Sequence, residues 1–250
     1  MPLPPVLFED EVLIAFDKPS GLPVSADHRE KAGENLTTLV REKMGEGIAS
    51  VHRIEAEVSG IALYAKTKPA LDFVSGQFQS KTVVKLHEAL VVGIPAADEY
   101  TVDFFLKEDE AKPGTVCVVK KHGWSSETVF QVTGKYPQTA DRAGYARVEG
   151  RPSTSRMHQL RVHLAASGTP ILNDPLYGDG TQLFLSDLKR GYKGRDDEKP
   201  LISRLALHAG GLIFTHPLTR EKLTLTSPLP NDFAVALKYL EKFSGGKGRR

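Results

Sequence analysis

Short apolar runs separated by polar turns cover most of the chain. The runs are rich in Val, Ile, Leu and Phe, which favours β-strands. Fewer segments repeat an apolar residue every three or four positions, as Leu36, Leu39 and Val40 do, and this spacing predicts helices. The expected strands lie within 6–18 around a turn at 9–11, and at 61–65, 83–92, 101–106, 115–119, 128–132, 145–148, 212–214 and 223–225. The expected helices lie at 34–44, 70–80, 157–166 and 232–243.

The helix expected at 157–166 has the clearest signals at its ends. The hydroxyl residues at 153–155 are candidate N-caps, and Gly168 followed by Pro170 would end the helix. Across the chain, strands outnumber helices and do not alternate with them regularly. This organisation predicts an α+β fold with a mixed, largely antiparallel sheet and flanking helices, rather than a doubly wound parallel sheet.

The composition is that of a soluble globular protein. Of the 250 residues, 40% are hydrophobic and 26% are charged, which excludes collagen-like, disordered and disulfide-rich chains. Cys117 is the single cysteine, so no intramolecular disulfide forms and a reducing compartment is expected. The first residues do not read as a secretory signal, and no apolar segment reaches the roughly 18 residues of a membrane span. We therefore expect a cytoplasmic protein that does not act at a membrane.

The net charge of +2 conceals an uneven distribution. Residues 1–150 carry 17 Lys and Arg against 22 Asp and Glu, whereas residues 151–250 carry 16 against 9. A basic half suits a polyanionic partner, with nucleic acid the first candidate. An unevenly charged but merely solvated surface fits the same counts equally well, and the polar stretch at 180–200 is expected to be a surface excursion.

Common nucleotide and metal signatures are absent from the sequence. There is no G-x-x-x-x-G-K-[ST] phosphate loop, no complete G-x-G-x-x-G turn and no G-x-S-x-G serine elbow. His158 and His163 are five positions apart, so in a helix they lie on different faces and do not form a metal-binding pair. No metal site and no cofactor are expected.

Two segments combine charged and polar residues in a way that suits catalysis. Residues 51–60 place Glu55 in a polar loop directly before an apolar strand. Residues 155–164 place Arg and His side chains at the start of a helix, where the positive end of the helix dipole favours an anion. A carboxylate held by an Arg beside such a helix start suits chemistry on a nucleotide. A surface salt bridge and an ordinary capped helix explain the same residues.

Five blocks of the chain resemble the RluA-type pseudouridine synthases of the RsuA/RluA superfamily. Residues 16–24 resemble the "KP-x-G-x-x-V" opening of that family, and residues 51–60 resemble its "H-R-L-D-x-x-T-S-G" signature. Residues 156–163 resemble "R-x-H-Q-(I/L)-R-x-H", and residues 173–178 resemble "G-D-x-x-Y-G". Residues 207–217 resemble the "L-H-A … H-P" ending. The shared order of the blocks extends the resemblance over most of the chain.

The resemblance implies an enzyme that isomerises uridine to pseudouridine in RNA without a cofactor, after flipping the target nucleotide into a pocket. In that family an aspartate starts breakage of the glycosidic bond, an Arg or Lys pairs with the aspartate, and a Tyr packs against the base. By position, these catalytic residues correspond to Glu55, Arg161 and His87. The resemblance assigns substrate and RNA binding to His52, Arg53, Arg156, His158 and Gln159.

Of the three catalytic positions, only Arg161 carries the family's residue. Glu55 adds one methylene to the expected Asp and moves the carboxylate by about 1–1.5 Å, and a misplacement near 1 Å can cost on the order of a hundredfold in rate. His87 lacks the phenol of Tyr but can still stack on a base and transfer a proton. Three functions stay open: a working pseudouridine synthase, an RNA-binding homologue without activity, and a different carboxylate chemistry on a nucleotide or glycoside.

The blocks straddle residue 150, so the charge asymmetry does not mark a domain boundary. We expect a single catalytic domain over residues 1–243, no RNA-binding extension before it, and a disordered basic tail at 244–250. The expected partner is rRNA or tRNA, bound by a monomer. Structural rather than catalytic roles are expected for Asp174, Tyr177, His208 and His216.

Overall fold

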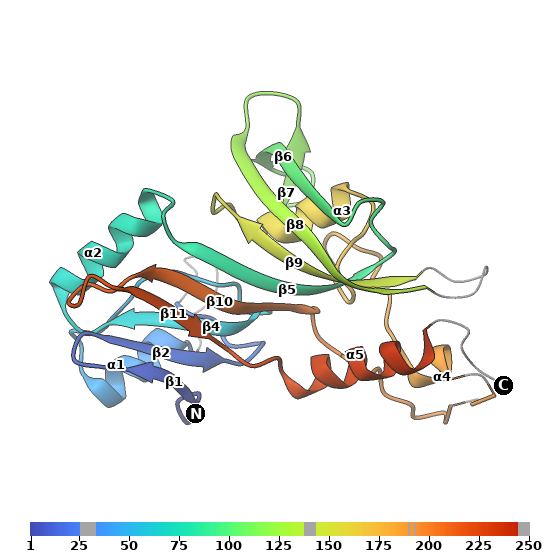
Figure 1. Ribbon diagram of the computed structural model, residues 1–250, viewed down its shortest axis with the longest axis horizontal. Helices are drawn as coiled ribbons and strands as arrows, with labels where there is room; N and C mark the ends of the chain where they lie inside the picture. The colour runs from blue at the N-terminus through green and yellow to red at the C-terminus, as the bar shows by residue number, and fades with distance from the viewer. Residues whose placement is uncertain (26–33, 138–143, 190, 193, 245–250) are drawn as a thin grey trace. The chain divides into compact units, whose positions relative to one another are not determined.

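Figure 1 presents the computed structural model of the chain, which describes residues 1–25, 34–137, 144–189, 191–192 and 194–244. The fold divides into two compact units. The first unit consists of Met1–His87 and His208–Pro228, and the second of Glu88–Leu207 and Leu229–Arg250. Strands β5 (Val84–Val92) and β10 (Leu207–Thr215) each cross a boundary between the units along the sequence. The single domain over 1–243 stays a prediction.

The first unit is built around an apolar sheet. Antiparallel pairing joins β1 to β2, β2 to β4, β3 to β4 and β10 to β11, while β10 runs parallel to β4. Apart from β10, its strands are β1 (Val6–Glu9), β2 (Leu13–Lys18), β3 (Ala49–Ser50), β4 (Ser59–Ala65) and β11 (Lys222–Thr226). Its helices are α1 (Leu36–Met44) and α2 (Lys68–Gln79).

Alternate residues of β2 enter two different cores. Leu13 packs in one core with Val74 of α2, whereas its neighbour Ile14 packs in the other with Leu39 of α1. Because successive side chains of a strand point to opposite faces of the sheet, α1 and α2 cover opposite faces. Burial on both faces explains why the run at 61–65 is apolar throughout rather than alternating between apolar and polar residues.

The second unit contains a sheet in the order β5-β9-β8-β6-β7. Strand β8 pairs antiparallel with β9 and with β6, and β6 pairs antiparallel with β7. Helix α3 packs on this sheet through a small core of Leu106, Val116 and Val162. The elements are β6 (Glu99–Glu108), β7 (Val116–Val119), β8 (Trp124–Tyr136), β9 (Tyr145–Pro152), α3 (Gln159–Ala166), α4 (Leu185–Leu188) and α5 (Asn231–Phe243).

The strand pairing confirms the expected α+β class, with a mixed, largely antiparallel sheet and flanking helices. The candidate caps at 153–155 are wrong, because the N-cap of α3 is His158, which has left-handed backbone (φ 52°) and makes no side-chain cap bond. The side chain of Gln159 holds this turn: its Oε1 accepts hydrogen bonds from the Arg156 backbone N–H (3.0 Å) and from the Thr154 hydroxyl (2.8 Å).

The polar stretch at 180–200, expected to be a surface excursion, contains the short helix α4. Arg190, Lys193 and residues 245–250 of the expected tail lie outside the described residues. Among the helices that the structure describes, none is both long and apolar enough to cross a membrane.

Candidate active site

Glu55 lies at the first position of a tight turn in the first unit. The backbone N–H of Val58 donates to the carbonyl of Glu55 (3.2 Å), which closes the turn directly before β4 begins at Ser59. The side chain of Glu55 is half-buried, whereas that of Glu57, two residues further on, is exposed. The turn therefore presents one carboxylate at a defined place and leaves the other in solvent.

Lys18 anchors this turn from the end of β2. Its side chain is fully buried, and its ammonium donates to the carbonyls of Leu22 (2.7 Å) and Ala56 (3.0 Å). Gly21 adds a backbone hydrogen bond to Ala56 (2.7 Å), and the Ser20 hydroxyl donates to the carbonyl of Glu57 (2.5 Å). The block that opens the family resemblance thus holds the Glu55 turn in place. Sequence reasoning missed Lys18 as a positioning residue, although a lysine at the end of an apolar strand before Pro was a usable signal.

The residues that follow Glu55 fit against the L-H-A block of β10. Ser59 Oγ lies 3.0 Å from His208 Nδ1, while His208 Nε2 lies 3.2 Å from the carbonyl of Ser227. That carbonyl only accepts, so Nε2 donates to it, and the Ser59 hydroxyl can donate to Nδ1. Gly60 has φ +121°, and a Cβ there would lie 2.2 Å from the carbonyl oxygen of Ala209. His208 and Ala209 therefore have a structural role, which is to hold β10 against the start of β4, as expected for His208.

Burial keeps the imidazoles near the start of β5 neutral. Burial lowers the pKa of His87 to about 3, with smaller effects from the charges of Lys85, His52 and His208. Burial also lowers the pKa of His52 to about 4, with Lys85 adding to the shift. The ring of His52 stacks on Phe78 at 5.2 Å, so its contacts are internal to the fold. His87 Nδ1 is buried without a hydrogen-bond partner among the described residues.

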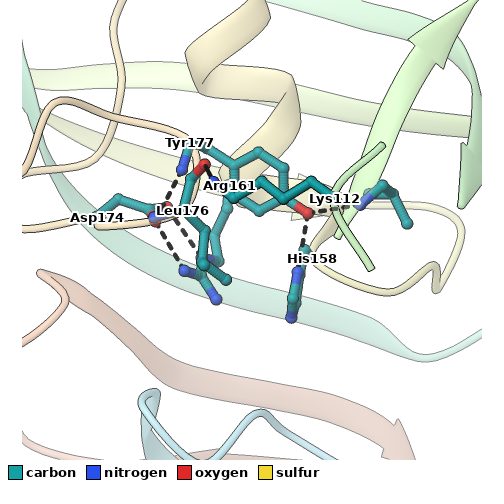
Figure 2. A network of polar contacts seen from close by, with 7 residues as sticks. Lys112, His158, Arg161, Asp174, Leu176 and Tyr177 are labelled. Atoms are coloured by element: carbon teal, nitrogen blue, oxygen red, sulfur yellow. Dashed lines mark hydrogen bonds and ion pairs between the residues drawn. The ribbon is translucent and has the colours of Figure 1, made fainter. Parts of the chain in front are cut away.

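Arg161 forms a bidentate ion pair within the second unit (Figure 2). Its Nε donates to Asp174 Oδ2 (2.9 Å) and its Nη2 to Asp174 Oδ1 (2.7 Å), and both residues are only 1% exposed. Oδ1 also accepts from the backbone N–H groups of Leu176 and Tyr177. Burial opposes ionisation of Asp174, but the hydrogen bonds and charge of Arg161 outweigh it and hold the pKa below its usual range. Asp174 closes the turn, as expected, and also fixes the guanidinium.

Tyr177 connects this ion pair to His158 and to the sheet (Figure 2). Its hydroxyl accepts from the backbone N–H of Val116 (2.8 Å) and lies 2.8 Å from His158 Nδ1. The guanidinium carbon of Arg161 lies 5.4 Å from the centre of the Tyr177 ring. Lys112 adds a hydrogen bond to the carbonyl of Leu176 (2.8 Å). Aromatic packing and hydrogen bonds together limit the orientations that Arg161 can adopt.

Gln159 and Arg156 differ sharply in their surroundings. The Gln159 amide is buried and donates to the Glu127 carbonyl (2.9 Å) and the Thr128 hydroxyl (3.0 Å), in addition to the two bonds that it accepts. These internal bonds use the hydrogen-bonding groups of the Gln159 side chain, so its role in the structure is to hold the turn before α3 against β8. Arg156 is exposed and is available to an anion, as is Arg53 in the first unit. Contacts of all three with RNA stay predictions.

The catalytic residues implied by the resemblance are divided between the units. Glu55 and His87 belong to the first unit, as do His52 and Arg53, whereas Arg161 belongs to the second. The expected pairing of Glu55 with Arg161 stays a prediction. Sequence reasoning missed Asp174 as a partner of Arg161, because the two are separated by the end of α3 and a loop. Within the described ranges, no group of three His, Cys, Asp or Glu side chains could hold a metal ion.

The buried histidines predict a loss of stability in mild acid. Burial lowers the pKa of His163 to about 4, so it joins His52 and His87 in resisting protonation in the folded state. An unfolded histidine titrates near pH 6.5, so the unfolded chain binds more protons below that pH. Each such group lowers the free energy of unfolding by up to about 1.4 kcal/mol per pH unit between pH 6.5 and 4.

Urea unfolding at pH 7.5, 6.0 and 5.0 measures this slope. His163→Gln should reduce the slope, because it removes one buried titrating group. His122→Gln is the matched control, since His122 is exposed, and should leave the slope unchanged. A free energy of unfolding that stays constant from pH 7.5 to pH 5.0 would contradict the prediction.

Comparisons with known proteins find relatives among the RNA pseudouridine synthases. The family model described as RNA pseudouridylate synthase matches residues 12–166. Ribosomal large subunit pseudouridine synthase C of Vibrio vulnificus (strain CMCP6) is 34% identical over 224 residues, which cover 90% of this chain and 65% of that protein. The Dual-specificity RNA pseudouridine synthase RluA of the same strain is 33% identical over 212 residues, which cover 85% of this chain and 78% of that protein.

A solved structure has the same fold over nearly the whole chain. Human RNA Pseudouridylate Synthase Domain Containing 4 superposes with a TM-score of 0.70 at 26% identity, covering 94% of this chain and 92% of that one. The family match spans Glu55, His87 and Arg161, and the two relatives match a larger share of the chain, 90% and 85%. The chain therefore belongs to the RNA pseudouridylate synthase family.

Proposed function

We propose that the protein is an RNA pseudouridine synthase, an isomerase that converts uridine to pseudouridine in structured rRNA or tRNA of the cytoplasm after flipping the base out of its stack. The observation that carries the proposal is the mutual fit of the family blocks. Lys18 and Gly21 hold the Glu55 turn, Ser59 and Gly60 fit against the L-H-A block, and Asp174 holds Arg161.

The reaction needs a few well-placed side chains and no redox change. The bond from ribose C1′ to uracil N1 breaks, a bond from C1′ to C5 forms, the proton on C5 leaves, and N1 gains a proton. Glu55 is the carboxylate assigned to the first step. Arg161 is the cation assigned to stabilise negative charge that develops as the bond breaks.

The structure supports an altered role for His87 compared with the family's Tyr. A pKa near 3 makes the neutral imidazole a weak base at pH 7, so His87 is poorly suited to remove the C5 proton. A neutral ring in a half-buried position can still pack flat against uracil. We therefore assign His87 to base packing.

The substrate class follows from relatives. The proteins named above act on ribosomal large subunit RNA or on RNA with dual specificity, according to their names. Large structured RNA is therefore the first substrate to test for this chain. The match with the first of these relatives covers 65% of that protein's length.

Tritium release from RNA labelled at uracil C5 tests the function. Wild-type protein should release tritium from total cellular RNA, and Glu55→Ala should release none above background because the carboxylate is gone. Glu57→Ala is the matched control, because its carboxylate lies two residues away and is exposed, and it should behave as wild type. Equal release by wild type and Glu55→Ala, or none by either, would contradict the proposed isomerisation.

An RNA-binding homologue without isomerase activity is the second candidate, and the Glu at position 55 favours it. Tritium release by Glu55→Asp but not by wild type would support this candidate, because it would reveal a uridine pocket whose carboxylate is misplaced.

A different carboxylate chemistry would need a second carboxylate beside Glu55. Glu57 is exposed and Asp174 is engaged by Arg161, so neither supports it.

A further inference from the structure

Trp124 is an exposed aromatic residue at the start of β8, directly after the loop of residues 120–123 that leads from β7 on one side of β6 to β8 on the other. Trp124 and Val118 are both paired with Leu106 of β6, so the three side chains lie on one face of the sheet. Leu106 is fully buried in the core beneath α3, whereas Trp124 is 52% exposed and Val118 is 40% exposed. The indole therefore lies at the edge of the face that α3 covers, with one side open to solvent.

The loop of residues 120–123 beside Trp124 is tightly folded. His122 has left-handed backbone (φ 63°), and a Cβ on Gly123 would lie 2.7 Å from a methyl group of Val119 and 2.8 Å from the carbonyl of Leu106. Only glycine fits at this position without displacement of its neighbours. Trp124 is thus held at the first position of a regular strand, which limits the entropy that a ligand must overcome on stacking against it.

Three cationic residues lie near Trp124, two of them in the loop before it and one bonded to the backbone of the residue after it. Lys120 and Lys121 are exposed in the loop between β7 and β8, and no carboxylate pairs with either of them among the residues that the structure describes. Arg156, from the segment before α3, donates from Nε to the carbonyl of Ser125 (3.1 Å), so its guanidinium lies beside the residue that follows Trp124. The family resemblance assigned Arg156 to RNA binding, but sequence reasoning had not connected it with Trp124.

We infer that Trp124 is a stacking platform for an unpaired base of the RNA, with Lys120, Lys121 and Arg156 contacting the flanking phosphates. An exposed indole can stack on any base, and the three cations match the charge of the adjoining backbone. A protein partner would fit the apolar surface of Trp124 but not the uncompensated charge around it. The inference deepens the proposed function, since it rests on RNA being the substrate class.

Intrinsic fluorescence provides a direct test, because Trp124 is the single tryptophan of the chain. Titration of the full chain with a ten-nucleotide single-stranded oligouridylate at low salt should quench the emission as the base stacks on the indole. Glu55→Ala should be quenched equally, because this variant removes the proposed chemistry and leaves Trp124 and the loop before it intact. Saturating RNA without a change in emission would overturn the inference.

Affinity measured with fluorescein-labelled RNA provides the second test. Trp124→Leu should weaken binding by about 5- to 150-fold, the range for loss of one stacked base. Phe105→Leu is the matched control: Phe105 lies on the neighbouring strand β6, is 44% exposed and points to the opposite face of the sheet, so this variant should bind as wild type does. Equal affinities of Trp124→Leu and wild type would overturn the inference.

The salt dependence of RNA affinity measures the contribution of Lys120 and Lys121 separately from that of Trp124. The slope of log affinity against log salt should become shallower by about 0.7 in Lys120→Gln and again in Lys121→Gln, because each variant removes one cation that binds a phosphate. An unchanged slope in both variants would overturn the role of the two lysines.

Tritium release without quenching would overturn the role of Trp124 alone. Quenching without tritium release would overturn the proposed isomerase activity and would still support the RNA-binding surface.

Discussion

Asp174→Ala should lower the free energy of unfolding by about 3–5 kcal/mol, the cost of removing one partner from a buried ion pair. Arg161 is only 1% exposed and would lose the carboxylate that binds both Nε and Nη2. The backbone N–H groups of Leu176 and Tyr177 would lose their acceptor as well. Since a domain of this kind is stable by only about 5–15 kcal/mol, we expect a large fall in the midpoint of urea unfolding.

A second ion pair of the same geometry supplies the control. Arg204 binds Asp232 through Nε (2.9 Å) and Nη2 (3.0 Å), but the Asp232 side chain is 35% exposed. Because this pair is partly solvated, Asp232→Ala should cost clearly less than Asp174→Ala. Asp174→Asn removes the negative charge but keeps a side-chain oxygen that can accept hydrogen bonds from the backbone N–H groups of Leu176 and Tyr177. This variant therefore distinguishes the loss of the charge from the loss of the turn. Equal losses in Asp174→Ala and Asp232→Ala would contradict the prediction.

Gly60→Ala should destabilise the first unit by about 2–5 kcal/mol. Left-handed backbone costs a side chain about 1–2 kcal/mol, and forcing an extra carbon into a packed site costs about 1–3 kcal/mol. The new methyl group would lie 2.2 Å from the carbonyl oxygen and 2.8 Å from the nitrogen of Ala209, so β10 would have to move away from β4. The measurement is urea unfolding, with tritium release as a second readout, because Gly60 follows the Glu55 turn closely.

Gly76→Ala is the matched control for this prediction. Gly76 lies within α2, and nothing lies within 4 Å of a Cβ added there. Alanine is the better helix former by about 0.5–1 kcal/mol, so this variant should be slightly more stable than wild type. A Gly60→Ala protein as stable as wild type would contradict the close approach of β4 and β10.

Local sequence was sufficient for features set by neighbouring residues. The strand at 61–65 and the helix at 70–80 could be predicted because apolar periodicity directly reflects which side chains are buried. The exact ends of these elements could not be predicted from apolar periodicity. Helix α2 begins at Lys68 because the Thr67 side chain accepts from the Ala70 N–H, and α3 begins late because the Gln159 side chain holds the preceding turn. Each depends on a hydrogen bond that apolar spacing does not reveal.

The residue types of the candidate site were visible in the sequence, but their partners were not. Glu55 and Arg161 were identified within family blocks, and His87 was identified as the residue at the position that corresponds to the family's Tyr. The roles of Lys18 and Asp174 emerged only from folding, because the carbonyls around Lys18 and the guanidinium beside Asp174 come from other segments. A sequence displays neighbours along the chain, whereas burial, pKa shifts and bidentate pairing depend on groups that only tertiary packing brings within a few ångströms.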